Sequence, residues 1–135
     1  MSLGLLDVKS TRVVYLNGDL SHTRLGLSDC HYALLASNIC SIYHCGSIVH
    51  VFMPYTELRT ANVCGTIEIL KLACLANARV NYISTIAVED ANNHTGYAES
   101  KRVSEKLMEQ ARERGLKVTI FRPGKPYDGL CFICN

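Results

Sequence analysis

The chain alternates short apolar segments with longer amphipathic ones, and this alternation constrains its fold more than any other feature. Runs rich in valine and isoleucine predict strands, and apolar positions at helical spacing predict the helices between them. The predicted strands cover residues 12–18, 39–46, 80–88 and 117–121, and the predicted helices cover 29–37, 54–76 and about 97–114. Strands separated by helices of this length are typical of βαβ units. We therefore expect an α/β fold: a Rossmann-like parallel sheet of about four strands, with flanking helices on both faces.

Length and composition allow one globular domain. The chain has 135 residues, 48% hydrophobic and 19% charged, so we expect residues 1–135 to form a single domain with its own core. The net charge of +2, without a basic stripe, argues against a nucleic-acid partner. No apolar run could cross a bilayer, and Asp7 interrupts the start too soon for a signal peptide. We expect a cytoplasmic protein with no membrane partner.

Seven cysteines are spread along the chain, an odd number without the pattern of a disulfide framework. Their position in apolar segments predicts buried free thiols in a reducing compartment. Cys131 and Cys134 have C-x-x-C spacing, but a zinc site needs about four ligands and no second pair has suitable spacing. We therefore expect no metal site.

A tyrosine and a lysine four residues apart open the last predicted helix. Tyr97 and Lys101 share one helix face, and Ser84 and Thr85 end the preceding predicted strand. Ligands in parallel-sheet folds lie beyond the carboxyl ends of the strands. A cation beside a phenol lowers its pKa from about 10 toward neutrality, as an acid catalyst requires. We expect the Thr85, Tyr97 and Lys101 side chains to border one pocket; the alternative is a solvated pair on an exposed helix face.

Five segments together carry a family resemblance: RVVYLNGDLSHTRLGLS, IYHCGSIVHVFMPYTELRTANVCGTIEILKLAC, YISTIAV, GYAESKRVSEKLM and VTIFRPG. From about Arg12 to Gly124 the chain resembles thioester reductase domains, NADPH-dependent members of the extended short-chain dehydrogenase/reductase superfamily. Such domains end nonribosomal peptide and polyketide synthases and occur in carboxylic acid and aminoadipate reductases. Fatty acyl-CoA reductases and nucleotide-sugar epimerases or dehydratases share Tyr-x-x-x-Lys but match the segment from Pro54 to Cys74 poorly.

The resemblance implies a catalytic role for three residues. Tyr97 would be the proton donor, Lys101 would tune it and hold the nicotinamide ribose, and Thr85 would bind the substrate carbonyl, with Ser84 as a less favoured substitute. The substrate would be an acyl thioester on the phosphopantetheine arm of an acyl carrier protein. The product would be an aldehyde or an alcohol.

The resemblance also implies that the cofactor is NADPH and indicates which residues bind it. Asp19 and Leu20 would contact the adenine, and the backbone at Gly46 would pass close to the cofactor. Pro123 and Gly124 would border the nicotinamide, and Tyr97 and Lys101 would complete the cofactor-binding set. His44 and Asn62 are expected to have structural roles, His44 as a packed residue at a strand end and Asn62 between helix and sheet.

Two departures from the family pattern indicate a partial domain. The family begins with a βαβ unit whose turn, of G-x-x-G-x-x-G type, binds the pyrophosphate at a helix N-terminus, and this sequence contains no such turn. The interval between Thr85 and Tyr97 is also shorter than in the family. We therefore expect a Rossmann-like domain truncated at its N-terminus. The alternative to a reductase is an inactive Rossmann-like remnant or binding module.

Overall fold

The computed structural model describes residues 13–124 and 132–134. Its strands are β1 (Ser41–His44), β2 (Arg79–Ile83), β3 (Val118–Pro123) and β4 (Phe132–Cys134). Its longer helices are α1 (Asp29–Asn38), α3 (Gly65–Ala76) and α4 (Gly96–Glu113). The shorter helical elements are η1 (Thr23–Gly26), α2 (Tyr55–Arg59), the π-helical turn η2 (Thr60–Cys64) and η3 (Ile86–Val88).

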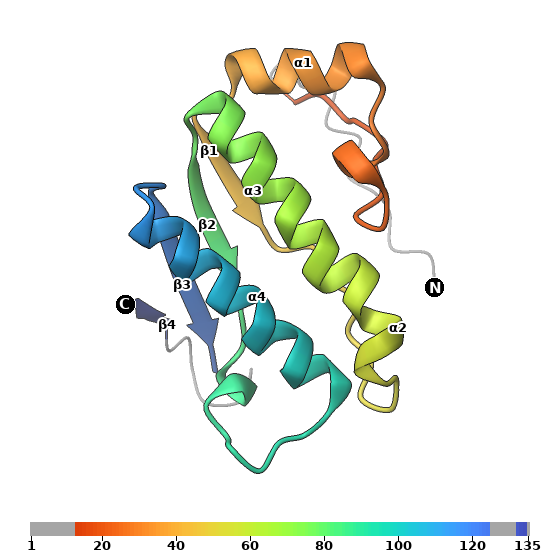
Figure 1. Cartoon of the computed structure of the whole chain (residues 1–135), viewed down its shortest axis with the longest axis vertical. Helices are drawn as coiled ribbons and strands as arrows, with labels where there is room; N and C mark the ends of the chain where they lie inside the picture. The colour runs from red at the N-terminus through yellow and green to blue at the C-terminus, as the bar shows by residue number, and fades with distance from the viewer. Residues whose placement is uncertain (1–12, 125–131, 135) are drawn as a thin grey trace.

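The four strands form one sheet in the order β1-β2-β3-β4 (Figure 1). β1, β2 and β3 are parallel, and their register places Ile42 opposite Val80 and Val80 opposite Val118. β4 is antiparallel to β3. The expected α/β, Rossmann-like parallel sheet is therefore confirmed. Its fourth strand is not the expected one, because β4 lies outside every predicted strand.

The prediction of a strand at residues 12–18 is wrong for residues 13–18, the part of it that the structure describes. These residues adopt no strand, and Val14 and Tyr15 are 80% and 81% exposed. A β-branched run favours a pleated surface, but a strand also needs a neighbour to accept its backbone hydrogen bonds. β1 is instead the edge strand of the described sheet. The Tyr43 side chain of this edge strand is exposed.

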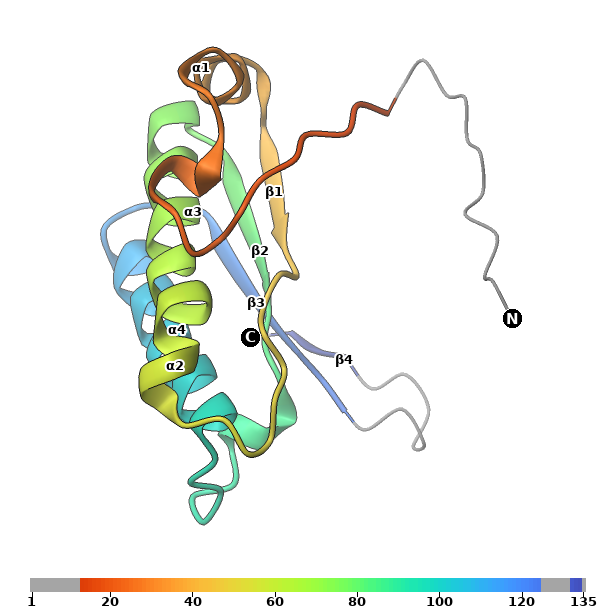
Figure 2. The same cartoon turned by 90° about the vertical axis from the view of Figure 1, so that its right-hand side faces the viewer.

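The helices of residues 13–124 lie on one face of the sheet, so the expectation of helices on both faces is wrong here (Figure 2). The strands follow one another in chain order across the sheet. Because crossovers between parallel strands are right-handed, two steps in the same direction place both connecting helices on the same side. A connecting helix lies on the second face only where the strand order reverses. The parallel strands β1, β2 and β3 show no such reversal, and residues 13–18 form no strand that could introduce one.

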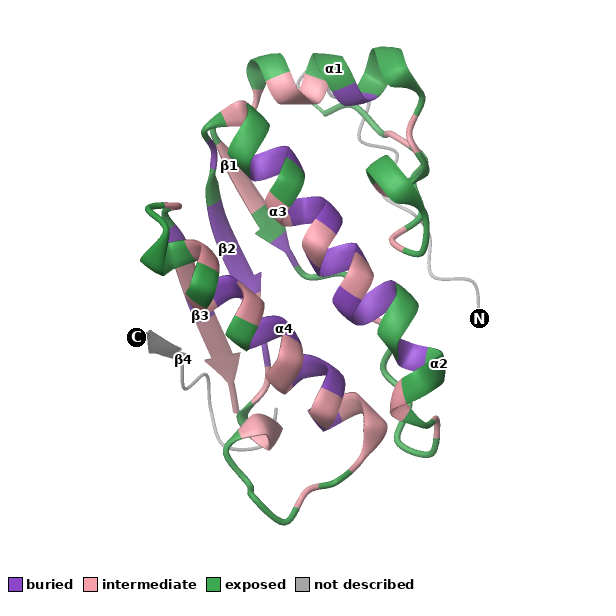
Figure 3. Cartoon of the chain, viewed as in Figure 1, coloured by how far each residue is buried: buried purple, intermediate pink, exposed green. Residues whose placement is uncertain are grey.

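The core lies between the sheet and the helices α3 and α4 (Figure 3). Val80 and Tyr82 of β2 lie beside Val118 and Ile120 of β3 in the core, two residues apart on each strand, as the two-residue period of a strand requires. Met108 of α4 packs against them and is fully buried. The core therefore fixes α4, the helix of Tyr97 and Lys101, directly over the two central strands.

The helix ends follow local sequence signals. Ser28 caps α1 by accepting a hydrogen bond from the His31 amide, and Gly115 follows α4 with a φ of 100°. Pro54 is the N-cap of α2 and not its first helical residue. Thr95, which was not predicted as a cap, accepts the Ala98 amide at the start of α4. None of the helices in residues 13–124 is long and apolar enough to cross a membrane.

The cysteines that the structure describes are free, but the prediction that they are buried is wrong for most of them. Cys30, Cys40, Cys45 and Cys74 are exposed, and Cys64 is half-buried. They lie at strand ends and on outer helix faces. The apolar character of the surrounding segment does not distinguish such exposed positions from buried ones. Of the C-x-x-C pair, Cys131 lies outside the described residues and only the backbone of Cys134 is described.

The start of α4 packs against the loop before α2 so closely that Gly96→Ala is expected to be destabilising. A Cβ at Gly96 would lie 2.4 Å from the Tyr55 amide nitrogen and 2.5 Å from the Met53 carbonyl oxygen. Backbone atoms cannot move aside as a side chain would, so we expect a cost of about 2 kcal/mol. Urea unfolding measures it, with Gly124→Ala as control because a Cβ there meets open space. Equal stability of the two variants would contradict this contact.

Candidate active site

Thr85 lies directly after β2, at the carboxyl edge of the sheet. It is the N-cap of η3, and its Oγ1 accepts a hydrogen bond of 3.2 Å from the Ala87 amide. The neighbouring Ser84 binds β3 through its amide, which donates to the Phe121 carbonyl at 2.7 Å. The Ser84 hydroxyl is buried and, among the described residues, has no hydrogen-bond partner. Two hydroxyl groups thus follow each other at this edge: that of Ser84 is buried without a partner, and that of Thr85 caps η3.

A cavity of about 690 Å³ opens beside Thr85. Its lining includes Pro123 and Gly124 at the end of β3, and Glu89 and Asp90 from the loop after η3. The structure therefore brings together Thr85 and the two residues expected beside the nicotinamide. Neither Tyr97 nor Lys101 lines this cavity, so a pocket shared by all three catalytic candidates stays a prediction.

Lys101 is a buried lysine, 2% exposed, which excludes the solvated alternative for this residue. Its Nζ donates to the Ile83 carbonyl at 2.8 Å and lies 4.7 Å from the centroid of the Tyr82 ring. Burial lowers the pKa of Lys101 to about 8, and the nearby Cys45 and Glu105 oppose that shift. The ammonium is thus held at the end of β2 by a carbonyl and an aromatic face.

Tyr97 is half-buried at the first turn of α4. Burial raises the pKa of its phenol above the usual value, and a hydrogen bond with Ser47 acts in the opposite direction. The expected lowering by Lys101 is not found, because the Lys101 ammonium is directed to Ile83 and Tyr82. The phenol is therefore protonated at neutral pH and able to donate.

The residues expected at the adenine lie together at the same edge. Asp19 is exposed, and a hydrogen bond from the Ser21 amide at 2.7 Å lowers the pKa of its carboxyl. Leu20 packs against Gly46 after β1, where a Cβ would lie only 2.7 Å from the Leu20 Cδ1. The structure thus joins Asp19, Leu20 and Gly46 although the strand predicted before them does not form.

Asn62 and His44 have the structural roles expected of them. Asn62, on the π-helical turn, accepts the Ile48 amide at 2.7 Å and donates to the Ile48 carbonyl and to the Ser100 hydroxyl, each at 3.0 Å. His44 is 4% exposed and hydrogen-bonds Thr66 at 3.1 Å. Burial, aided by Lys101, lowers the pKa of His44 to about 4, so it is neutral at pH 7. Both residues connect the loop after β1 to the helices.

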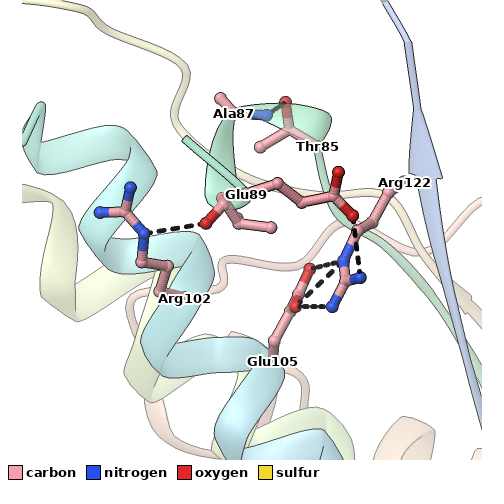
Figure 4. Close-up of polar contacts among 7 residues, drawn as sticks. Thr85, Ala87, Glu89, Arg102, Glu105 and Arg122 are labelled. Atoms are coloured by element: carbon pink, nitrogen blue, oxygen red, sulfur yellow. Dashed lines mark hydrogen bonds and ion pairs between the residues drawn. The ribbon is translucent and has the colours of Figure 1, made fainter. Parts of the chain in front are cut away.

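Sequence reasoning missed three charged residues, Arg102, Glu105 and Arg122, near the Thr85 segment, which we define as residues 85–90. Arg102 of α4 binds the loop after η3, and Arg122 of β3 binds Glu105 of α4 (Figure 4). Glu105 follows Lys101 by one helical turn, a spacing that could have drawn attention to it. No pattern along the chain pairs Arg122 with Glu105, because the two lie on different elements.

A parallel sheet with a hydroxyl at a strand end, beside a helix that opens with Tyr-x-x-x-Lys, defines a dinucleotide-binding domain of Rossmann-like fold. The sequence matches the NAD-binding family described as "Male sterility protein" over residues 4–95 and 88–125. The chain belongs to that family. The resemblance to thioester reductase domains of the extended short-chain dehydrogenase/reductase family is confirmed by its relatives.

The chain is 34% identical over 137 residues to the isonitrile lipopeptide synthase of Streptomyces coeruleorubidus, covering 90% of this chain and 9% of that protein. It is 32% identical over 143 residues to the L-2-aminoadipate reductase of Schizosaccharomyces pombe, covering 84% of this chain and 10% of that protein. Among solved structures, the terminal R domain from the myxalamid PKS-NRPS biosynthetic pathway matches with a TM-score of 0.74 and 40% identity. That match covers 82% of this chain and 33% of the R domain. The chain thus spans a small part of these relatives.

Proposed function

We propose that the chain forms the hydride-transfer region of an NADPH-dependent reductase acting on an acyl thioester. The observation that carries this proposal is the position of Thr85, Pro123 and Gly124 around one cavity. The similarity to an aminoadipate reductase and to the terminal R domain supports the reaction class.

The described residues fit a nicotinamide cofactor at the carboxyl edge. The cavity beside Thr85 provides room and polar groups for a ligand at the ends of β2 and β3, and the buried Ser84 hydroxyl next to it has no hydrogen-bond partner among the described residues. Bound there, the cofactor would supply the hydride for the substrate carbonyl carbon. The residues that would hold it are Asp19 and Leu20 at the adenine, Gly46 along the backbone, Tyr97 and Lys101 at the ribose, and Pro123 and Gly124 at the nicotinamide.

The site residues would stabilise and then protonate the carbonyl oxygen. Negative charge grows on that oxygen as the carbonyl carbon is reduced, and the Thr85 and Tyr97 hydroxyls would donate hydrogen bonds to it. The Tyr97 proton then passes to the oxygen. The Lys101 ammonium, which binds the Ile83 carbonyl and the Tyr82 ring in this structure, would turn toward Tyr97 to stabilise the phenolate that remains. When the resulting hemithioacetal collapses, the C–S bond breaks and the thiol leaves with a proton. The product is an aldehyde, and a second reduction would yield an alcohol.

The partner we propose is an acyl carrier protein that presents the acyl group on its phosphopantetheine arm. The similarity to a lipopeptide synthase and to the terminal R domain of a PKS-NRPS pathway supports this partner over a free acyl-CoA. A comparison of NADPH oxidation with carrier-bound and CoA-bound thioesters of the same acyl group separates the two. A preference for acyl-CoA would place the chain with fatty acyl-CoA reductases instead.

Calorimetric titration with NADPH tests the cofactor site directly. We expect micromolar binding to the purified chain and about tenfold weaker binding by Asp19→Asn, because the carboxylate would lose a charge-assisted hydrogen bond worth about 1.4 kcal/mol. Asparagine retains the oxygen that accepts the Ser21 amide. Glu57→Gln removes an exposed carboxylate from α2 and should bind as the wild type does. Absence of binding to the wild-type chain would overturn the proposal and leave the inactive remnant.

A further inference from the structure

The short segment that carries Thr85 is bound from two sides by arginine side chains. Thr85 caps η3, and the loop after η3 continues through Glu89 and Asp90. Figure 4 shows Arg102 approaching this segment from α4, and Arg122 reaching it from β3. A three-residue 3₁₀ helix has few hydrogen bonds of its own, so these outside contacts decide where it lies.

Arg102 binds the segment through two backbone carbonyls. Its Nε donates to the Val88 carbonyl at 3.1 Å and its Nη2 to the Asp90 carbonyl at 2.6 Å. The planar guanidinium directs both donors at once, which a lysine ammonium cannot do with the same geometry. Arg102 directly follows Lys101 in α4, so this contact ties the Thr85 segment to the helix of the proposed acid.

Arg122 connects the segment to both β3 and α4. Its guanidinium forms a bidentate pair with Glu105, with Nε–Oε1 at 3.0 Å and Nη2–Oε2 at 2.7 Å. Its Nη1 also lies 3.3 Å from Oε1 of Glu89. The Glu105 side chain is 7% exposed and that of Arg122 is 19% exposed, so solvent screens this pair little. Glu89 is thereby held to a charged pair that is itself anchored between helix and strand.

We propose that Arg102 and Arg122 are positioning residues that fix the Thr85 hydroxyl relative to Tyr97 and shape the adjoining cavity. The proposal rests on the proposed function, in which Thr85 binds the substrate carbonyl. Glu89 and Asp90, which the two arginines hold, line the cavity together with Thr85. A hydroxyl displaced by about 1 Å loses much of its effect on a transition state, so the arginines would act on turnover without touching the substrate.

Hydrogen exchange tests the positioning role on the full chain without cofactor or substrate. The amides of Ala87 and Glu89 are protected by hydrogen bonds to Thr85 and Ile86. Arg102→Met should speed exchange of these amides about tenfold, because the anchor of η3 is lost. Exchange in β2 should stay as in the wild type. Arg102→Lys should recover only part of the protection. Lys106→Met removes an exposed charge from the same helix and should change neither region.

Turnover supplies the second measurement. Arg102→Met and Arg122→Met should each lower kcat about tenfold and change the KM for NADPH much less, because Asp19, Leu20 and Gly46 at the adenine lie on other segments. Unchanged exchange of Ala87 and Glu89 would overturn the proposal, and so would equal acceleration across η3 and β2, which indicates general destabilisation. If the wild type shows no turnover, the proposed function fails, while the exchange result still decides whether Arg102 fixes the Thr85 segment.

Discussion

Tyr97→Phe is expected to lower kcat for thioester reduction about a thousandfold, with little change in the KM for NADPH. Phenylalanine keeps the ring but removes the proton donor, and general acids contribute about 10²–10⁴-fold to such rates. Burial raises the pKa of Tyr97, so its phenol stays protonated at mildly alkaline pH, whereas Lys101 loses its charge above about pH 8. Wild-type activity should therefore hold through neutral pH and fall above about pH 8. Steady-state NADPH oxidation at several pH values measures both effects.

The control for this substitution is Tyr43→Phe, which removes the same hydroxyl from an exposed position on β1. We expect Tyr43→Phe to retain wild-type kcat. Retention of activity by Tyr97→Phe would show that another group protonates the oxygen, and Thr85 or Ser84 would then be the next candidates.

Lys101→Met is expected to abolish most of the reductase activity and, at pH 7, to make the protein more stable. The pKa of Lys101 falls from 10.5 to about 8. At about 1.36 kcal/mol per unit, this shift corresponds to about 3 kcal/mol for holding a charge in the interior. Methionine removes that cost and loses the hydrogen bond to Ile83, worth about 1 kcal/mol. We therefore expect the free energy of unfolding to rise by about 2 kcal/mol.

The stability gain should depend on pH in a defined direction. Between pH 8 and 10.5 the unfolded chain binds more protons at Lys101 than the folded chain does, so wild-type stability rises with pH across this window. The advantage of Lys101→Met is thus complete below pH 8 and shrinks toward pH 10.5. Urea unfolding at pH 7 and pH 9.5 measures it, with Lys106→Met, exposed on the same helix, as control. A Lys101→Met protein that is less stable than the wild type at pH 7 would contradict this assignment.

The elements with strong local signals were predicted almost residue by residue. The helix predicted at about 97–114 is α4, Gly96–Glu113, because its apolar period, its first residues and Gly115 are all close together in sequence. The helix predicted at 54–76 is present but is divided into α2, the π-helical turn η2 and α3. That division places Asn62 against Ile48 and Ser100, partners that helical periodicity does not reveal.

The prediction of the first strand failed because a strand forms only when a neighbouring strand accepts its backbone hydrogen bonds. The run at residues 13–18 has the β-branched residues of a strand, yet in the described structure it pairs with no neighbour. The prediction that helices cover both faces of the sheet failed for a related reason. Which face a helix covers depends on the order in which strands pair, and that order is fixed only when distant segments meet.

The sequence by itself determined the fold class, the family and the chemical identity of Thr85, Tyr97 and Lys101, because each depends on residue types at short, fixed spacings. The tertiary structure alone decided that Lys101 is buried with a pKa of about 8 and that Thr85 shares a cavity with Pro123 and Gly124. It alone also revealed the arginines at the Thr85 segment. Burial, charge and cavity shape arise from side chains that are distant in sequence and adjacent in space, so no pattern along the chain contains them.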